Sequence, residues 1–301
     1  MLRARDSSRQ ALRPHFWVGV GLLAVGNFLI FARAPGGDFL RPYSDYWFAC
    51  VWFGYIFAVD ALVYQRDRRS LFVSARPVFL AMLPLSAAAW WGFEWLNERM
   101  QNWHYLRPYD IPEWYANFIS CVFFSTVIPA VWETADWLRG TQWARNLPEL
   151  RAITYPRFVP YLLIAAGIAS FVLPLVWPRY FFGLIWGFAA LVLDPINYLA
   201  GRPSIIGFVE RGKWRVPIAF YLAGLTCGVL WEFWNFWAFP KWYYTVPYVG
   251  FLKVFEMPVL GYLGYGPFAL ELFAVFWFFA GLLPRHRNLG GLVPLKMGLE
   301  E

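Results

Sequence analysis

Long apolar stretches alternate with short polar segments along the whole chain. A helix that crosses a membrane needs about 20 consecutive, largely apolar residues. Eight stretches approach this length, and clusters of Arg and Lys fall between them. The pattern therefore predicts eight membrane-spanning helices, at about 16–34, 46–64, 78–98, 115–137, 158–177, 181–200, 215–238 and 259–283.

The composition favours the same class. Of the 301 residues, 59% are hydrophobic and only 15% are charged, whereas a soluble domain averages about 25% charged residues. No small-residue cleavage site follows the first apolar stretch, so we expect an uncleaved first helix rather than a signal peptide. The predicted fold class is all-α, a polytopic helical bundle in a membrane.

The placement of the basic residues predicts an orientation. With the N-terminus inside, 19 of the 26 Arg and Lys residues fall in inside segments and 7 in outside segments. Because cytoplasmic connections are enriched in Arg and Lys, both termini are expected on the cytoplasmic side of the inner membrane. The net charge of +7 thus serves orientation, and we expect no nucleic-acid partner.

Two sets of polar residues recur with the same spacing. In each set a Glu is followed by Asn at +3, by Pro at +35 and by a second Glu at +39. The sets are Glu94, Asn97, Pro129 and Glu133, and Glu232, Asn235, Pro267 and Glu271. Four spans per set predict two parallel repeats, residues 1–150 and 151–301, related by an axis along the membrane normal.

Two weaker matches extend the repeat. Asp60 and Asp194 are each followed by Tyr four residues later, and Asn102-Trp103-His104-Tyr105 resembles Lys241-Trp242-Tyr243-Tyr244. The two aspartates fall near the inner ends of their spans. We interpret the Trp and Tyr residues of the second match as anchors at the membrane interface.

Acids inside a membrane are costly and are functional candidates. A carboxyl group kept from water can hold a proton at neutral pH and donate it, while aromatic faces stabilise a passing cation. Glu94 and Glu232 are the candidate acid and base. Asn97 and Asn235 would orient them, and Glu133 and Glu271 would complete a proton path. Asp60 and Asp194 are further candidates. This chemistry suits a cyclase or isomerase acting on an isoprenoid or another membrane lipid.

Other interpretations remain open. The Glu/Asn pairs can hold the two halves together by hydrogen bonds across helices, and the two aspartates can cap helices or reach the cytoplasmic interface. A break is expected before Glu271, from Pro258, Gly261, Gly264, Gly266 and Pro267. Broken helices beside acids also occur in transporters, so a transporter or channel for a cation or small solute is one alternative. A non-catalytic scaffold or pigment-binding partner is another.

No cofactor or metal is expected. None of the three His residues lies in the middle of a span, which argues against a haem ligand. No His/Cys spacing typical of zinc is present. No Gly-rich phosphate loop is present either. The Cys residues, Cys50, Cys121 and Cys227, are widely spaced in apolar sequence, which is typical of core residues.

The second polar set resembles a known family. The stretch Gly228–Asn235, followed by Glu256-Met257-Pro258 and Pro267–Phe273, resembles the lycopene cyclase domain of the heterodimeric carotenoid cyclases. The chain departs from the family pattern in two ways. A single acid, Glu271, stands four residues after Pro267, whereas that family has a pair of Glu residues two positions after the proline. The aspartate that the family has before the Trp-Asn patch is absent from residues 216–230. The resemblance implies a small helical repeat that occurs in two copies, and a carotenoid ring-forming activity without a redox cofactor.

Overall fold

The computed structural model describes residues 12–31, 41–107, 110–147 and 150–282. Residues 32–34 and 283, at the ends of two predicted spans, lie outside these ranges. The same holds for the basic residues before Arg13 and after residue 282, and for Arg33, all of which entered the charge count.

The described chain is mostly helical with little sheet. The long helices are α1 (Pro14–Phe31), α3 (Trp47–Asp67), α5 (Arg76–Met100), α6 (Glu113–Phe124), α7 (Val127–Arg139), α9 (Val159–Val176), α11 (Phe188–Leu199), α13 (Arg215–Trp237) and α14 (Tyr265–Ala280). Short helices are α2 (Arg41–Ser44), α4 (Leu71–Ser74), α8 (Gln142–Arg145), α10 (Pro178–Phe181) and α12 (Ile205–Glu210), with 3-10 turns η2 (Phe182–Trp186) and η3 (Val259–Gly264). The strands are β1 (Trp103–Leu106), β2 (Lys241–Tyr244), β3 (Lys253–Val254) and β4 (Met257–Pro258).

Within the described ranges, six helices are long and apolar enough to cross a membrane: Pro14–Phe31, Trp47–Asp67, Glu113–Arg139, Val159–Val176, Arg215–Trp237 and Val259–Ala280. A seventh candidate is a pair, Pro178–Trp186 and Phe188–Leu199, bent by 42° at Gly187. The 25-residue α5 is not among them, because Pro84, Glu94 and weakly hydrophobic Trp residues lower its mean hydropathy. The predicted all-helical class is therefore confirmed in its coarse form, and the apolar helices have the length and composition of membrane spans.

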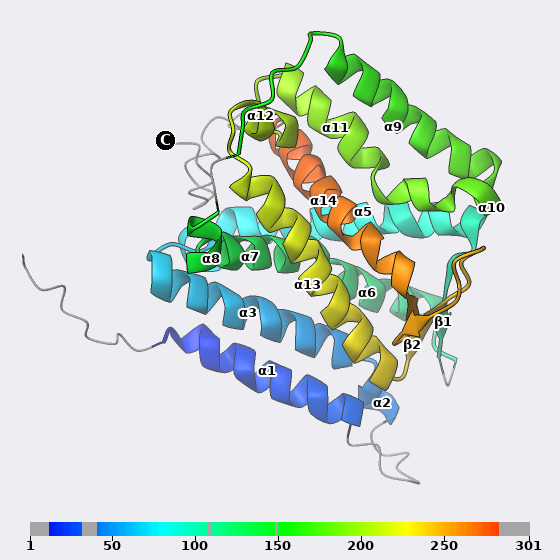
Figure 1. Ribbon diagram of the computed structural model, residues 1–301. Coiled ribbons are helices and arrows are strands. Elements are labelled where there is room, and N and C mark those ends of the chain that lie inside the picture. Colours follow the sequence, from blue (N-terminus) through cyan, green and yellow to red (C-terminus); the bar gives the residue numbers. More distant parts are fainter. Residues whose placement is uncertain (1–11, 32–40, 108–109, 148–149, 283–301) are drawn as a thin grey trace, which may run out of the picture.

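Close helix packing depends on small residues. Figure 1 shows α1 beside α3 and α9 beside α11, with α13 and α14 between these two pairs. A Cβ atom added to Gly19 of α1 would lie 2.7 Å from the backbone O of Gly54 in α3. A Cβ atom on Gly54 would lie 2.7 Å from the backbone N of Leu23. Only glycine permits this approach, and close van der Waals packing of this kind holds membrane helices together.

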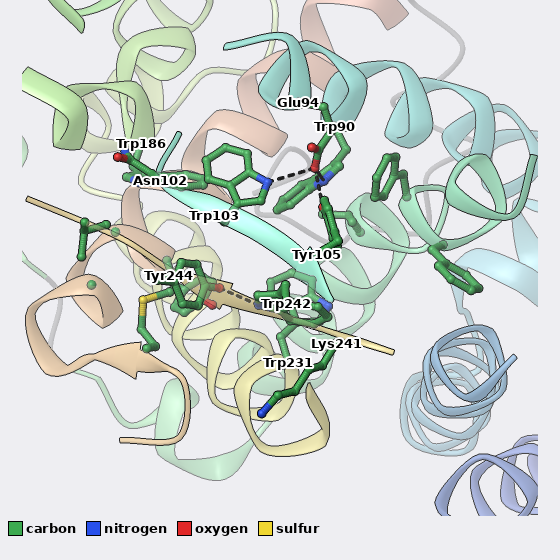
Figure 2. Close-up of a pocket in the computed structure, with 18 of the residues that line it drawn as sticks. Trp90, Glu94, Asn102, Trp103, Tyr105, Trp186, Trp231, Lys241, Trp242 and Tyr244 are labelled. Atoms are coloured by element: carbon green, nitrogen blue, oxygen red, sulfur yellow. Dashed lines mark hydrogen bonds between the residues drawn. The ribbon is translucent and has the colours of Figure 1, made fainter. Parts of the chain in front are cut away.

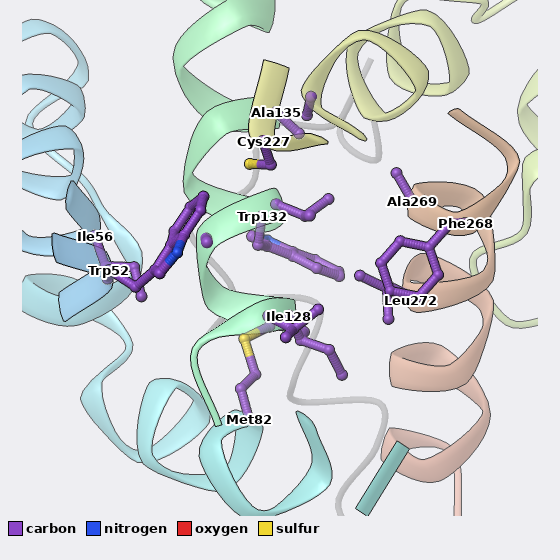
Figure 3. Packing of buried hydrophobic residues seen from close by; sticks show 14 of the residues in the cluster. Trp52, Ile56, Met82, Ile128, Trp132, Ala135, Cys227, Phe268, Ala269 and Leu272 are labelled. Carbon is purple, nitrogen blue, oxygen red and sulfur yellow. The ribbon is translucent and has the colours of Figure 1, made fainter. Parts of the chain in front are cut away.

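The core lies around α7. Trp132 of α7 is fully buried, and its ring centroid lies 5.0 Å from that of Phe220 and 4.6 Å from that of Phe276. Both contacts are edge-on, the favoured geometry for aromatic pairs. Figure 3 shows Trp132 between Trp52 of α3 and Leu272 of α14. The central helix thus contacts elements from both ends of the chain.

Candidate functional site

A large cavity lies at the end of the bundle where β1 and β2 meet. Its volume is about 830 Å³, within the range of roughly 300–1,000 Å³ typical of small-molecule sites. Its wall is mainly apolar and rich in aromatic side chains, which include Trp47, Phe48, Trp90, Trp186 and Trp231. Figure 2 shows the two strands running through the site. The cavity can hold a largely apolar molecule.

The pairing of β1 with β2 explains why aromatic side chains gather there. The strands are antiparallel, and Trp103 is paired with Tyr244 while Tyr105 is paired with Trp242. Side chains alternate between the two faces of a strand, and paired residues share a face. All four of these side chains therefore lie on one face, and all four line the cavity. His104 and Tyr243 stack on each other, with ring centroids 5.2 Å apart.

Glu94 of α5 lines the cavity directly. Its Oε1 accepts hydrogen bonds from Trp90 Nε1 at 2.8 Å, from Trp103 Nε1 at 3.1 Å and from the Tyr105 hydroxyl. Two of these donors come from β1, which follows α5 after a left-handed turn at Gln101 (φ 54°). Figure 2 shows the three donors converging on the carboxyl group. Glu94 is thus held in one position at the cavity wall.

Glu232 of α13 lies behind the cavity wall and is fully buried. Its Oε1 accepts hydrogen bonds from the Tyr244 hydroxyl at 2.7 Å and the Tyr265 hydroxyl at 2.6 Å, and both tyrosines line the cavity. Burial and, next, the charge of Glu232 raise the pKa of Tyr244 well above the ordinary tyrosine value. The hydroxyl of Tyr244 therefore keeps its proton and remains a donor. Glu232 is connected to the cavity through these two hydroxyl groups.

Asn97 and Asn235 act on the strands rather than on the carboxyl groups. Asn97 Oδ1 accepts from the backbone N of Asn102 at 2.8 Å, and its Nδ2 donates to the backbone O of Trp103 at 2.8 Å. Asn235 bonds both the backbone N and the backbone O of Trp242, each at 2.8 Å. We expected these amides to orient the two glutamates. Among the hydrogen bonds of the described residues, they instead fix the strands that carry the partners of the glutamates.

Glu271 belongs to α14, and its side chain contacts the start of α11, next to the break at Gly187. Its Oε1 accepts from the backbone N of Ala189 at 2.8 Å, while Oε2 has no hydrogen-bond partner among the described residues. The first N–H groups of a helix have no partner within the helix, so this bond satisfies one of them. The predicted irregular start of the last span is present as η3 followed by α14. Glu271 does not line the cavity.

Glu133 is fully buried in α7 and also lies away from the cavity lining. Neither of its carboxyl oxygens has a hydrogen-bond partner in the part of the chain that the structure describes. Asp60 and Asp136 are acidic neighbours of Glu133. An unpaired buried carboxyl group costs stability.

We therefore expect Glu133→Leu to raise the stability of the protein by about 1–3 kcal/mol, the usual penalty of an unsatisfied buried polar group. Leu is close to Glu in size and introduces no polar atom. Thermal unfolding in detergent micelles measures the change. A lower melting temperature than wild type would contradict this expectation and show that the carboxyl group stabilises the fold.

Asp60 and Asp194 cap helices. Asp194 accepts from the backbone N of Ile205 at 2.6 Å and of Ile206 at 3.0 Å, at the start of α12. Asp60 accepts from the backbone N of Phe72 at 2.7 Å, at the start of α4, and also contacts Ser70 and His15, each at 2.9 Å. Carboxylates are favourable at helix N-termini. The capping interpretation thus fits both aspartates, and neither lines the cavity.

Three tyrosines complete the site but were not among the predicted site residues: Tyr105, Tyr244 and Tyr265. Tyr105 and Tyr244 occupy matching places in the repeated Trp-containing motif, and each binds the Glu of its own set. That repetition was the available signal, although we interpreted these residues as interface anchors. No comparable pattern marks Tyr265.

Nothing in the described ranges forms a group of three or more His, Cys, Asp or Glu residues that could hold a metal ion. The two cations that line the cavity each have an acidic neighbour. Arg107 lies 3.9 Å from Asp45, and Lys241 contacts Glu256. The polar chemistry offered to a ligand is therefore mainly carboxyl, hydroxyl, indole N–H and amide.

Comparisons with protein-family models, with curated proteins and with solved structures gave no match for this chain.

Proposed function

We propose that the protein is a membrane enzyme that acts on an isoprenoid or another lipid by acid–base chemistry. The observation that carries the proposal is the access of two carboxyl groups to one aromatic cavity. Glu94 reaches it directly, and Glu232 reaches it through Tyr244 and Tyr265. General acid–base catalysis needs a donor and an acceptor at hydrogen-bond reach of the substrate.

The proposed reaction is an isomerisation such as ring closure. The proton of one carboxyl group adds to a carbon–carbon double bond and leaves a carbocation. For Glu232 the proton passes through a tyrosine hydroxyl, which takes up the carboxyl proton as it gives up its own. A second double bond attacks the cation and closes the ring. The other carboxyl group then takes a proton from a neighbouring carbon, so no atom is gained or lost. The faces of Trp90, Trp103 and Trp231 would stabilise the cation.

We also propose eight spans in two parallel repeats, 1–150 and 151–301, with both termini cytoplasmic. The 25 residues of α5 suffice for an eighth span. Matching roles support the duplication: Asn97 and Asn235 each bond a strand backbone, and Asp60 and Asp194 each cap a short helix. The pairing of Trp103 with Tyr244 and of Tyr105 with Trp242 is the exchange expected of a twofold axis.

The test is production of the protein in bacteria that make acyclic polyenes, followed by liquid chromatography and mass spectrometry of the lipid extract. We expect a compound of unchanged mass and altered absorption spectrum that is absent from cells without the protein. Lipid profiles identical with and without the protein, across isoprenoids of several chain lengths, would contradict the proposal.

A transporter is the second candidate. Its support is the 42° bend before α11, with Glu271 bound at the break, because broken helices beside acids form ion and substrate sites in transporters. Proton- or cation-dependent uptake into liposomes that Glu271→Gln abolishes would favour this function. A purified protein that carries a pigment but converts nothing would instead indicate a binding partner.

A further inference from the structure

The amide of Asn102 is a buried polar group without a partner at the cavity wall. Asn102 is 3% exposed, and neither its Nδ2 nor its Oδ1 has a hydrogen-bond partner among the described residues. The side chain lines the cavity, beside Trp186 in Figure 2. Buried polar groups in proteins are nearly always paired, so an unpaired amide at a cavity indicates a missing partner.

The backbone of Asn102 is fixed on both sides. Its N–H donates to Asn97 Oδ1 at 2.8 Å, and its carbonyl oxygen accepts from the backbone N of Thr245 at 2.9 Å. The position of the amide is therefore set by α5 and by the chain that follows β2. Such rigid support is what a binding site needs to select a ligand.

The chemistry of an amide defines the partner. Nδ2 is a donor and Oδ1 is an acceptor, and a hydroxyl group can satisfy both because it donates one hydrogen bond and accepts others. An anionic head group fits less well, because the lining cations Arg107 and Lys241 already have acidic neighbours and Glu94 is close by in the same cavity.

The residue at the start of the repeated motif differs between the two strands. Asn102 immediately precedes β1, and the matching position in the second polar motif is Lys241, which is engaged by Glu256. Lys241 is paired with Leu106, at the other end of β1. Four strand residues span about 13 Å. The cavity thus has a neutral amide at one end and an ion pair at the other, which suits a ligand with unlike ends.

We infer that Asn102 is a binding subsite for the hydroxyl group of an otherwise apolar ligand, such as a long-chain isoprenoid alcohol. This inference rests on the proposed function in taking the cavity as the substrate site. It adds the polar end of the substrate and the residue that selects it. Glu94 and Glu232 do the chemistry, and Asn102 positions the molecule from its hydroxyl end.

The test measures binding rather than turnover. All-trans-retinol, its methyl ether and the hydrocarbon that lacks the oxygen are titrated into the purified protein in nanodiscs. Energy transfer from the tryptophans of the cavity to the polyene reports occupancy. Wild type should bind the alcohol at least ~10-fold more tightly than the hydrocarbon, because the hydrocarbon leaves the amide unpaired. The ether, which only accepts, should fall between them.

Asn102→Leu should bind the alcohol and the hydrocarbon with equal affinity. Its affinity for the hydrocarbon should equal that of wild type, which would show that the cavity is intact. The matched control is Asn117→Leu, at an exposed position of α6, which should keep the preference. Equal affinities in wild type would overturn the inference and mean that water alone pairs the amide. Glu94→Gln should retain the preference, so a failure of catalysis and a failure of this subsite give different results.

Discussion

Glu94→Gln and Glu232→Gln should each reduce turnover by about 10²–10⁴-fold, the usual contribution of a general acid or base. Gln retains a carbonyl oxygen at the position of Oε1. The bonds from Trp90, Trp103 and Tyr105 to residue 94, and from Tyr244 and Tyr265 to residue 232, can therefore persist. What is lost is the ability to exchange a proton. Stability should stay close to that of wild type, so the effect is on the chemical step.

The measurement is the rate of product formation in nanodiscs, with the polyene that gives a product in cells. Glu98→Gln is the matched control, because Glu98 lies on the same helix as Glu94 but is exposed; it should convert substrate at the wild-type rate. Tyr244→Phe removes one of the two hydroxyl groups between the Glu232 carboxyl and the cavity. A reduced rate in this variant would indicate that Glu232 exchanges protons with the substrate through Tyr244, and an unchanged rate would indicate that it does not. Wild-type rates in both Gln variants would show that neither glutamate acts as a general acid or base.

The second large effect is expected on the fold. Asn97→Ala and Asn235→Ala should each lower the free energy of unfolding by roughly 2–6 kcal/mol, because each leaves at least two backbone groups without their partner at about 1–3 kcal/mol per group. The bonds concerned join Asn97 to the backbone of Asn102 and Trp103, and Asn235 to that of Trp242. Loss of either amide should also loosen the strand pair.

Thermal unfolding in detergent measures the first effect, and near-ultraviolet circular dichroism of the aromatic cluster measures the second. Asn117→Ala serves as the control because residue 117 is exposed and should leave the melting temperature within a degree or two of wild type. If Asn97→Ala has the same melting temperature as the control variant, the hydrogen bonds from this amide to the backbone do not stabilise the folded protein.

The sequence was most informative about the helices. Within the described ranges, each of the eight predicted apolar stretches overlaps helical segments, because the length of an apolar run is a local property of the chain. Six of the stretches correspond to helices that are long and apolar enough to span a membrane. The break at Gly187 was missed: the stretch 181–200 was predicted as one span, yet it divides into η2 and α11. Glu271 was assigned to a proton path because it is the second Glu of its set, and its bond to the backbone N of Ala189 was not foreseen.

The site was only partly predictable. The spacing of Glu94 with Asn97 and of Glu232 with Asn235 identified the right helices, since acids in apolar sequence stand out. The pairing of β1 with β2 joins residues more than 130 positions apart, and two four-residue strands have no local signal that reveals a distant partner. Without that pairing, Trp103 and Tyr105 are indistinguishable from interface anchors, and the role of the Asn amides in holding the strands is hidden.

The strand pair also bears on how the chain is divided. Backbone hydrogen bonds between β1 and β2, together with the packing of α7 on α13, join the two halves of the sequence without using the connection between α8 and α9. A gene cut at that connection would therefore encode two polypeptides able to assemble again when synthesised together. The first half, made alone, would leave the edge of β1 without its partner strand.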